Sequence, residues 1–151
     1  MKFYSGIVLY CVTEGRILLI SQRSGEKEHW LVPHGSVEAG ESYTDAAVRA
    51  ISNTLDISDS DIEELCTIEN GSRTEKYFIS YSECCLLLNS HAGTALRTGH
   101  ESGSKMVWVY IEKLPFLPLP PALKNALAKQ IFILDGGTLC QRLSYHDGLN
   151  L

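Results

Sequence analysis

The sequence lacks the features that would place the chain in a membrane or along a nucleic acid. No apolar run approaches the roughly 20 residues that span a bilayer, and the Met-Lys-Phe-Tyr start has no signal-peptide core. Basic residues are not in excess, and the net charge of −5 argues against a broad electrostatic contact with DNA or RNA. These absences favour a cytoplasmic protein and count against a membrane or nucleic-acid partner.

Cysteine is scarce and is not arranged for metal or redox chemistry. The five cysteines are Cys11, Cys66, Cys84, Cys85 and Cys140. No two of them form a Cys-x-x-Cys pair, the common spacing of metal and redox sites. We interpret them as buried, reduced thiols, with a reactive thiol as the alternative.

What is present is the composition of one ordinary globular domain. The chain has 151 residues, of which 44% are hydrophobic and 21% charged, enough to build a real core. No internal repeat or linker divides it, so we expect a single domain over residues 1–151. Three alternatives remain open for the tail, residues 138–151: an extra strand, an oligomer contact such as a homodimer, or a disordered end.

The most informative stretch runs from Trp30 to Ile57. A short apolar strand leads through Pro33 into a loop with two glycines, and a helix follows. Ser42 with Asp45 three residues later is typical of a helix N-cap and places the helix start at Ser42.

Two faces of this helix follow from a rotation of about 100° per residue. The face expected to be buried carries Val48, Ile51 and Leu55, with Ala47 beside them. The side expected to lie opposite carries Ala46, Ala50, Asn53 and Thr54.

The strand, loop and helix resemble the box of the Nudix hydrolase superfamily. The positions that fit its frame are Gly35, Glu41, Arg49, Ile51 and Ile57, and those that fit its extended form are Trp30, Pro33, Glu38 and Gly40. The positions that depart from it are Ala50, Asn53 and Thr54, where the family has metal-binding glutamates, and Asp56, where it has a glycine.

These departures bear on the metal and the catalytic base that the resemblance implies. Mg²⁺ prefers carboxylate and other oxygen ligands in near-octahedral geometry, which methyl, amide and hydroxyl side chains do not replace. We therefore expect no metal cofactor and absent or severely impaired catalysis, with the chain binding a nucleotide-like ligand or a protein partner. The alternative is an active Nudix hydrolase that cleaves a nucleoside diphosphate linked to another group, using Mg²⁺ and relocated acids.

The candidate site residues come partly from the resemblance. Arg23, His34 and Gly35 are the candidates for nucleotide binding, although Arg23 and His34 also fit ordinary solvated positions. Glu41 and Arg49, with Gly35, are expected to hold the shape of the box through an ion pair.

The candidate relocated acids are Glu38, Glu41 and Glu101. The segment from His100 to Trp108 is similar to one in diadenosine tetraphosphate hydrolases, where a loop glutamate precedes a strand that carries a tryptophan. That likeness implies a role for Glu101 as metal ligand or base, and a solvated loop carboxylate is the alternative.

The order of elements predicts an α/β fold. Strands are expected over Phe3–Val12, Arg16–Ser21, Ile62–Glu69, Lys76–Leu88 and Met106–Ile111, with turns at Glu14-Gly15 and Asn70-Gly71. Four prolines between Leu114 and Pro121 form an extended connector before a second helix, whose apolar stripe is Leu123, Leu127, Ile131 and Leu134. With the resemblance, this predicts a Nudix-type α/β/α sandwich with a mixed sheet.

Overall fold

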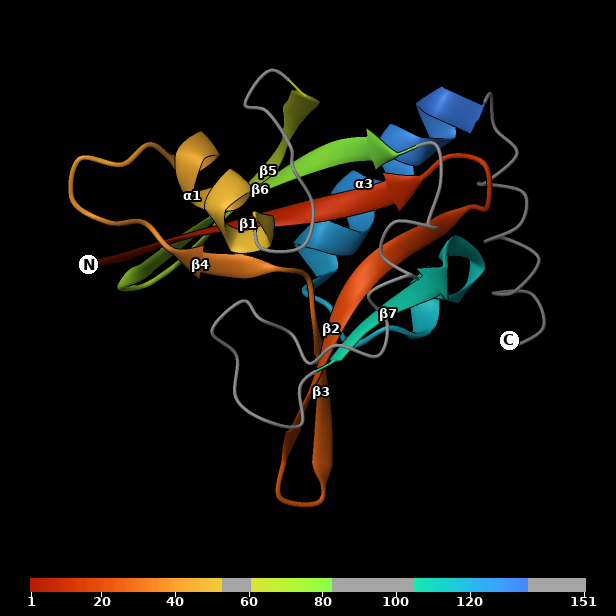
Figure 1. The fold of residues 1–151 in the computed structure, drawn as a ribbon, viewed down its shortest axis with the longest axis horizontal. Helices are drawn as coiled ribbons and strands as arrows, with labels where there is room; N and C mark the ends of the chain where they lie inside the picture. The colour runs from red at the N-terminus through yellow and green to blue at the C-terminus, as the bar shows by residue number, and fades with distance from the viewer. Residues whose placement is uncertain (53–60, 83–104, 136–151) are drawn as a thin grey trace.

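The computed structural model describes residues 1–52, 61–82 and 105–135 (Figure 1). The expectations that lie outside the described residues are those for Asn53, Thr54, Leu55, Asp56, Ile57, Cys84, Cys85, the strand end at 83–88, His100, Glu101, the side chain of Leu134, Cys140 and the tail, 138–151. None of the described helices is long and apolar enough to cross a membrane.

Seven strands of the described residues form one mixed sheet. They are β1 (Lys2–Cys11), β2 (Arg16–Ser24), β3 (Lys27–Leu31), β4 (His34–Ser36), β5 (Ile62–Asn70), β6 (Arg73–Ser82) and β7 (Lys105–Tyr110). The main order is β3-β2-β1-β6-β5, with β4 paired to β1 and β7 paired to β2. The β1–β6 pair is parallel and the others are antiparallel, which confirms the predicted mixed sheet.

The predicted turns are present and some strand boundaries differ. Gly15 and Gly71 have φ of 64° and 59°, the left-handed conformation that a tight turn requires and glycine adopts readily. The segment 34–36 was expected to be loop and forms β4, because it pairs with the apolar strand β1. β6 begins at Arg73 instead of Lys76, because the hairpin with β5 continues to the Asn70–Arg73 pair.

The sheet divides into two wings, which Figure 1 shows diverging from a common end. β1 and β2 pair there, through Tyr10 with Ile17 and Cys11 with Arg16. Beyond that end, β1 lies between β4 and β6, whereas β2 lies between β3 and β7. We call β4-β1-β6-β5 the first wing and β3-β2-β7 the second wing.

Two helices cover opposite faces of the sheet. α3 (Pro121–Asp135) follows the 3₁₀ segment η2 (Ile111–Phe116) and buries the predicted stripe residues Leu123, Leu127 and Ile131. These residues pack with alternate positions of the strands, such as Val8, Ile17, Leu19 and Ile79. α1 (Tyr43–Ile51) covers the other face with Ala47 and Ile51, against Ile7, Leu9, Leu18 and Phe78. The predicted α/β fold with helices on both faces is confirmed.

The buried face of α1 differs from the predicted one. Ile51 and Ala47 are buried as expected, but Val48 is only partly buried. Ala46 was assigned to the opposite side and is fully buried, and Ala50, on that same side one turn later, is partly buried. The two consecutive alanines have side chains small enough to lie against the sheet, so the helix is rotated toward them and away from the larger Val48.

Two of the cysteines lie among the described residues. Cys11 is buried, Cys66 is partly buried, and both are free thiols. Burial raises the pKa of the Cys66 thiol, so it is protonated and unreactive near neutral pH. Cys11 thus matches the predicted burial, and Cys66 matches it only in part.

Candidate functional site

The box begins on β4, which is fixed to the start of β1. His34 pairs with Gly6, Gly35 with Ser5, and Ser36 with Tyr4. The backbone continues this attachment, because the Val37 N–H donates to the Phe3 carbonyl at 2.9 Å. The first part of the loop therefore follows the edge of the sheet.

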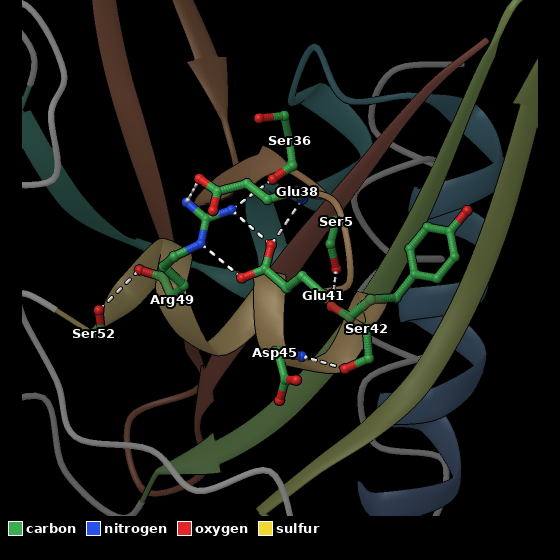
Figure 2. Close-up of polar contacts among 9 residues, drawn as sticks. Ser5, Ser36, Glu38, Glu41, Ser42, Asp45, Arg49 and Ser52 are labelled. Atoms are coloured by element: carbon green, nitrogen blue, oxygen red, sulfur yellow. Dashed lines mark hydrogen bonds and ion pairs between the residues drawn. The ribbon is translucent and has the colours of Figure 1, made fainter.

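Helix α1 starts where the sequence predicts. The Ser42 hydroxyl accepts a hydrogen bond from the Asp45 N–H at 3.0 Å, satisfying a donor that the first turn leaves free. The Ser5 hydroxyl of β1, which is fully buried, donates to the Tyr43 carbonyl at 2.6 Å (Figure 2). The cap and this bond together fix the helix start on the sheet.

Glu41 and Arg49 form the predicted ion pair, and it is bidentate (Figure 2). Arg49 Nε donates to Glu41 Oε2 at 2.9 Å, and Arg49 Nη2 donates to Glu41 Oε1 at 3.0 Å. The same Nη2 donates to the Ser36 carbonyl at 2.6 Å, and the Glu38 N–H donates to Glu41 Oε1 at 3.0 Å. The two side chains thus join both ends of the loop to α1, and we call this arrangement the Arg49 clamp.

The Arg49 clamp sets the protonation state of Glu41. The hydrogen bonds from Arg49, with that from the Glu38 N–H, lower the pKa of Glu41 to about 2, and Glu41 raises that of Arg49. A carboxylate with so low a pKa is a poor proton acceptor near neutral pH. Both of its oxygens are also already bonded to nitrogen donors, so the geometry suits a structural anion.

Glu38 is the second candidate acid of the loop. Its carboxylate lies 3.9 Å from Arg49 Nη1, and 68% of the side chain is exposed to solvent. A pair this long and this exposed contributes little to stability. The backbone N–H of Glu38 is thus part of the Arg49 clamp, whereas its carboxylate is held only weakly.

His34 lies at the junction of loop and sheet. Its Nδ1 is 3.1 Å from the Val32 carbonyl, so a neutral ring that donates there carries its proton on Nδ1 and presents Nε2 as an acceptor. No interaction of Nε2 occurs with the described residues.

The structure brings some predicted site residues together and separates one. Gly35, Glu38, Glu41 and Arg49 share the loop and the start of α1, with His34 next to them. Arg23 is on the second wing, where its backbone pairs with Glu28 at the end of the β2–β3 hairpin. Its predicted contact with phosphate stays a prediction.

Of the residues that the structure describes, Ala50 and Glu41 fit poorly the divalent metal that the box resemblance implies. Among the residues that the structure describes, no three His, Cys, Asp or Glu side chains are grouped to hold a metal ion. Ala50, at the first of the three altered positions, has no donor atom. The oxygens of Glu41 are engaged by the Arg49 clamp.

Two contacts of this region were not predicted from the sequence. The Ser36 carbonyl is a further acceptor for Arg49, and the Ser5 hydroxyl holds the start of α1. Ser5 had a visible signal, because it is a lone hydroxyl next to Gly6 at the start of an apolar strand. No feature of the sequence indicated Ser36, since its contact with Arg49 uses the backbone carbonyl that every residue has.

Comparison with known proteins identifies the arrangement. The family model described as NUDIX domain matches residues 4–130. No curated protein sequence matches the chain at a significant level.

Three solved structures with a similar fold are described as different kinds of protein. A MutT structure, from a study of Aliivibrio salmonicida and Vibrio cholerae, is 19% identical with a TM-score of 0.61, over 85% of this chain and 98% of that chain. A C. elegans Ap4A hydrolase in a binary complex is 19% identical with a TM-score of 0.61, over 90% and 99%. Shewanella oneidensis NrtR complexed with a 27mer DNA is 16% identical with a TM-score of 0.62, over 85% of this chain but 61% of that one.

Proposed function

The chain belongs to the Nudix family, and we propose that it uses the family's fold to bind a nucleotide-like ligand or a protein partner with little or no hydrolysis. The observation that carries the proposal is the state of the box. Its frame is held by the Arg49 clamp, while Ala50 stands on α1 where the family has a metal-binding glutamate. The positions of the other two glutamates are Asn53 and Thr54.

The absence of these carboxylates affects both the activation of the attacking water and the neutralisation of phosphate charge. A divalent cation in such a site would activate the attacking water and neutralise charge on the phosphates. Two of the three altered side chains offer at most a neutral oxygen, and the third offers none. Hydrolysis would therefore lack its main electrostatic stabilisation, which is usually the largest single contribution to catalysis.

The alternative, hydrolysis by relocated acids, is weakened by the geometry of Glu41. A general base must be able to take a proton, and a pKa of about 2 leaves Glu41 ionised but weakly basic. A metal on Glu41 would have to share a carboxylate that already accepts hydrogen bonds from Arg49 and from the Glu38 N–H. Glu38 alone is one exposed carboxylate, too few for a tight Mg²⁺ site.

The ligand class rests on charge and on the remaining site residues. A His34 ring protonated on both nitrogens would donate from Nε2 to a phosphate, and with the predicted Arg23 contact this suits a phosphate-bearing small molecule. A net charge of −5 supports a nucleotide or a protein partner over DNA, although NrtR, a structure of similar fold, was solved with DNA.

The test measures turnover and binding separately. Purified protein is assayed with ADP-ribose and dinucleoside polyphosphates at physiological Mg²⁺, beside the variant A50E/N53E/T54E. We expect no turnover by the natural chain and a Mg²⁺-dependent gain in the variant, with thermal melting used to check that the partly buried position 50 tolerates glutamate. Turnover near 1–1,000 s⁻¹ by the natural chain would refute the proposal and favour the alternative, hydrolysis by relocated acids.

Binding is tested in the same preparation by thermal shift. The panel contains mononucleotides and dinucleoside polyphosphates, each with Mg²⁺ or with EDTA. A ligand at 100 times its dissociation constant adds about 2.7 kcal/mol to the free energy of unfolding, which is easily measured. If no nucleotide raises the melting temperature, binding of a nucleotide-like ligand is excluded, and a protein partner is the remaining part of the proposal.

A further inference from the structure

The turn between β5 and β6 contains the one asparagine of the chain that is followed by glycine. Five asparagines occur, and the residues that follow the other four are Thr54, Ser90, Ala126 and Leu151. Asn70 pairs with Arg73 and closes the hairpin, which leaves Gly71 and Ser72 as a two-residue turn. We call residues 70–73 the Asn70 turn.

The Asn70 turn lies open to solvent. Asn70, Gly71 and Ser72 are all exposed, and a Cβ built on Gly71 would meet no atom within 4 Å. Within the described part of the chain, the side-chain amide of Asn70 makes no hydrogen bond, and no carbonyl accepts one from the Gly71 N–H. The amide carbon of Asn70 and the backbone nitrogen that follows it are therefore both accessible to water and hydroxide.

We propose that Asn70 is a site of spontaneous deamidation, a covalent modification that needs only water. When the Gly71 N–H gives its proton to hydroxide, that nitrogen attacks Cγ of Asn70. The new N–Cγ bond closes a succinimide ring, and the Cγ–Nδ2 bond breaks as the amide nitrogen takes a proton and leaves as ammonia. Water then opens the ring at one carbonyl or the other, giving aspartate or isoaspartate. No oxidant or reductant takes part, and the reaction does not depend on ligand binding by the fold.

Glycine after the asparagine is what makes this turn reactive. The attacking nitrogen must approach the preceding side chain, and a side chain on its own residue would hinder that approach, whereas Gly71 has none and its backbone is the most adaptable. Asn70 is held by its pair with Arg73, so this pair must open before the attack. Opening at the end of a hairpin costs less free energy than opening its centre. The Lys2 N–H donates to the Ser72 carbonyl at 2.8 Å and resists the opening, so the reaction should be slower than in the unfolded chain.

The product changes the charge around Arg73. Asn70 and Arg73 lie directly opposite each other, which places their Cβ atoms about 4.5–5.5 Å apart on one face of the sheet. Arg73 Nε lies 3.1 Å from Oε2 of Glu75, and the guanidinium carbon lies 4.0 Å from the centroid of the Tyr4 ring. A carboxylate at residue 70 would compete with Glu75 for this cation, and isoaspartate would also lengthen the main chain of the turn. The modification therefore acts on the end of the first wing where β1 begins.

Two other asparagines serve as matched controls. Asn125 is also exposed, but Ala126 follows it inside α3, where the backbone N–H donates to the carbonyl four residues earlier. Trypsin cleaves after lysine and arginine, so it releases Asn125 in the peptide 125–129 and Asn70 in the peptide 50–73. The second peptide also contains Asn53, which threonine follows.

The experiment follows these two peptides by mass spectrometry. The purified chain is incubated at neutral and at mildly alkaline pH, either folded or unfolded in urea, and fragmentation assigns any replacement of NH₂ by OH to a residue. We expect deamidation at Asn70 in both states, faster in urea and in proportion to hydroxide, with far less at Asn125 and Asn53. Asn70→Gln keeps the amide and the exposed turn but requires a larger ring, so it should abolish the modification.

The products test the succinimide route. Protein isoaspartate methyltransferase labels isoaspartate alone, so labelling of the incubated chain and not of Asn70→Gln is expected. Direct hydrolysis by water would give aspartate without isoaspartate and would overturn the proposed step. If Asn70 is converted in urea but not in the folded chain, or if Asn70 and Asn125 react at equal rates, the folded turn is not a modification site. Persistence of the mass change in Asn70→Gln would contradict the assignment to this residue.

Discussion

The sharpest stability prediction concerns Gly6, in the middle of β1. A Cβ added at this residue would lie 2.7 Å from both Cδ1 and Cε1 of Tyr77 and 3.3 Å from Cγ2 of Val32. Carbon atoms in favourable contact are about 3.5–4.0 Å apart, so Gly6→Ala forces atoms to move. The Tyr77 ring occupies the space that the missing side chain leaves.

The magnitude depends on whether that ring can move. Tyr77 is 7% exposed, packs in the core cluster beneath α3, and donates its hydroxyl hydrogen to Glu75. A shift of the ring would break this bond or press on Val32. Overpacking of a well-filled core costs about 1–3 kcal/mol, and we expect Gly6→Ala to lie in that range.

The assay is equilibrium unfolding in urea with a matched glycine as control. A Cβ at Gly35 would meet only the Arg49 guanidinium, at 3.9 Å, so Gly35→Ala should change stability by no more than about 0.5 kcal/mol. The cost of Gly6→Ala should shrink in a Tyr77→Leu background, since the clashing ring is gone. Equal midpoints for Gly6→Ala and the natural chain, or an undiminished cost in the Tyr77→Leu background, would refute the steric argument.

Three further predictions follow from the core, the Arg49 clamp and the proline connector. Ile51→Ala should lower the free energy of unfolding by about 2–5 kcal/mol because Ile51 is fully buried, and Val48→Ala should cost clearly less; similar urea midpoints would contradict the observed helix face. The pKa of the Glu41 carboxyl, measured by NMR, should be about 2 and should return toward 4.5 in Arg49→Ala. Because this pKa is lowered in the folded state, the stability that Glu41 contributes should be full above about pH 4.5 and should be lost as the pH falls toward 2. Lys124 Nζ donates to the Pro115 and Leu117 carbonyls at 3.2 and 3.0 Å, so Lys124→Met should lower the free energy of unfolding by about 1–3 kcal/mol. An unchanged melting temperature would show that Lys124 does not stabilise the proline connector.

Much of the fold was predictable because its signals are local. The Ser42 cap, the turns at Gly15 and Gly71 and the stripe of α3 each depend on residues a few positions apart, and each is present in the structure. The Glu41–Arg49 pair was predictable for another reason, since the resemblance to the box supplied the contact in advance.

The misses share a different cause, which is that they depend on tertiary packing. The rotation of α1 follows from how closely Ala46 and Ala47 approach the sheet. The sequence prediction used only the spacing of the larger apolar residues, so it placed Val48 on the buried face. β4 is three residues long and exists through pairing with β1, so no propensity marks it.

The residues of the box that fix the shape of its loop differ from those that would bind a cation. This chain carries the first set. Shape comes from Glu41, Arg49 and the Ser36 carbonyl, whose hydrogen bonds involve no metal and no glutamate of the helix. Charge for a cation would come from the positions of Ala50, Asn53 and Thr54, which are not the positions that form the Arg49 clamp. Because the two sets of positions are separate, the carboxylates can be absent while the loop keeps its form. A Nudix box without its usual acids thus keeps the hydrogen bonds that shape its loop.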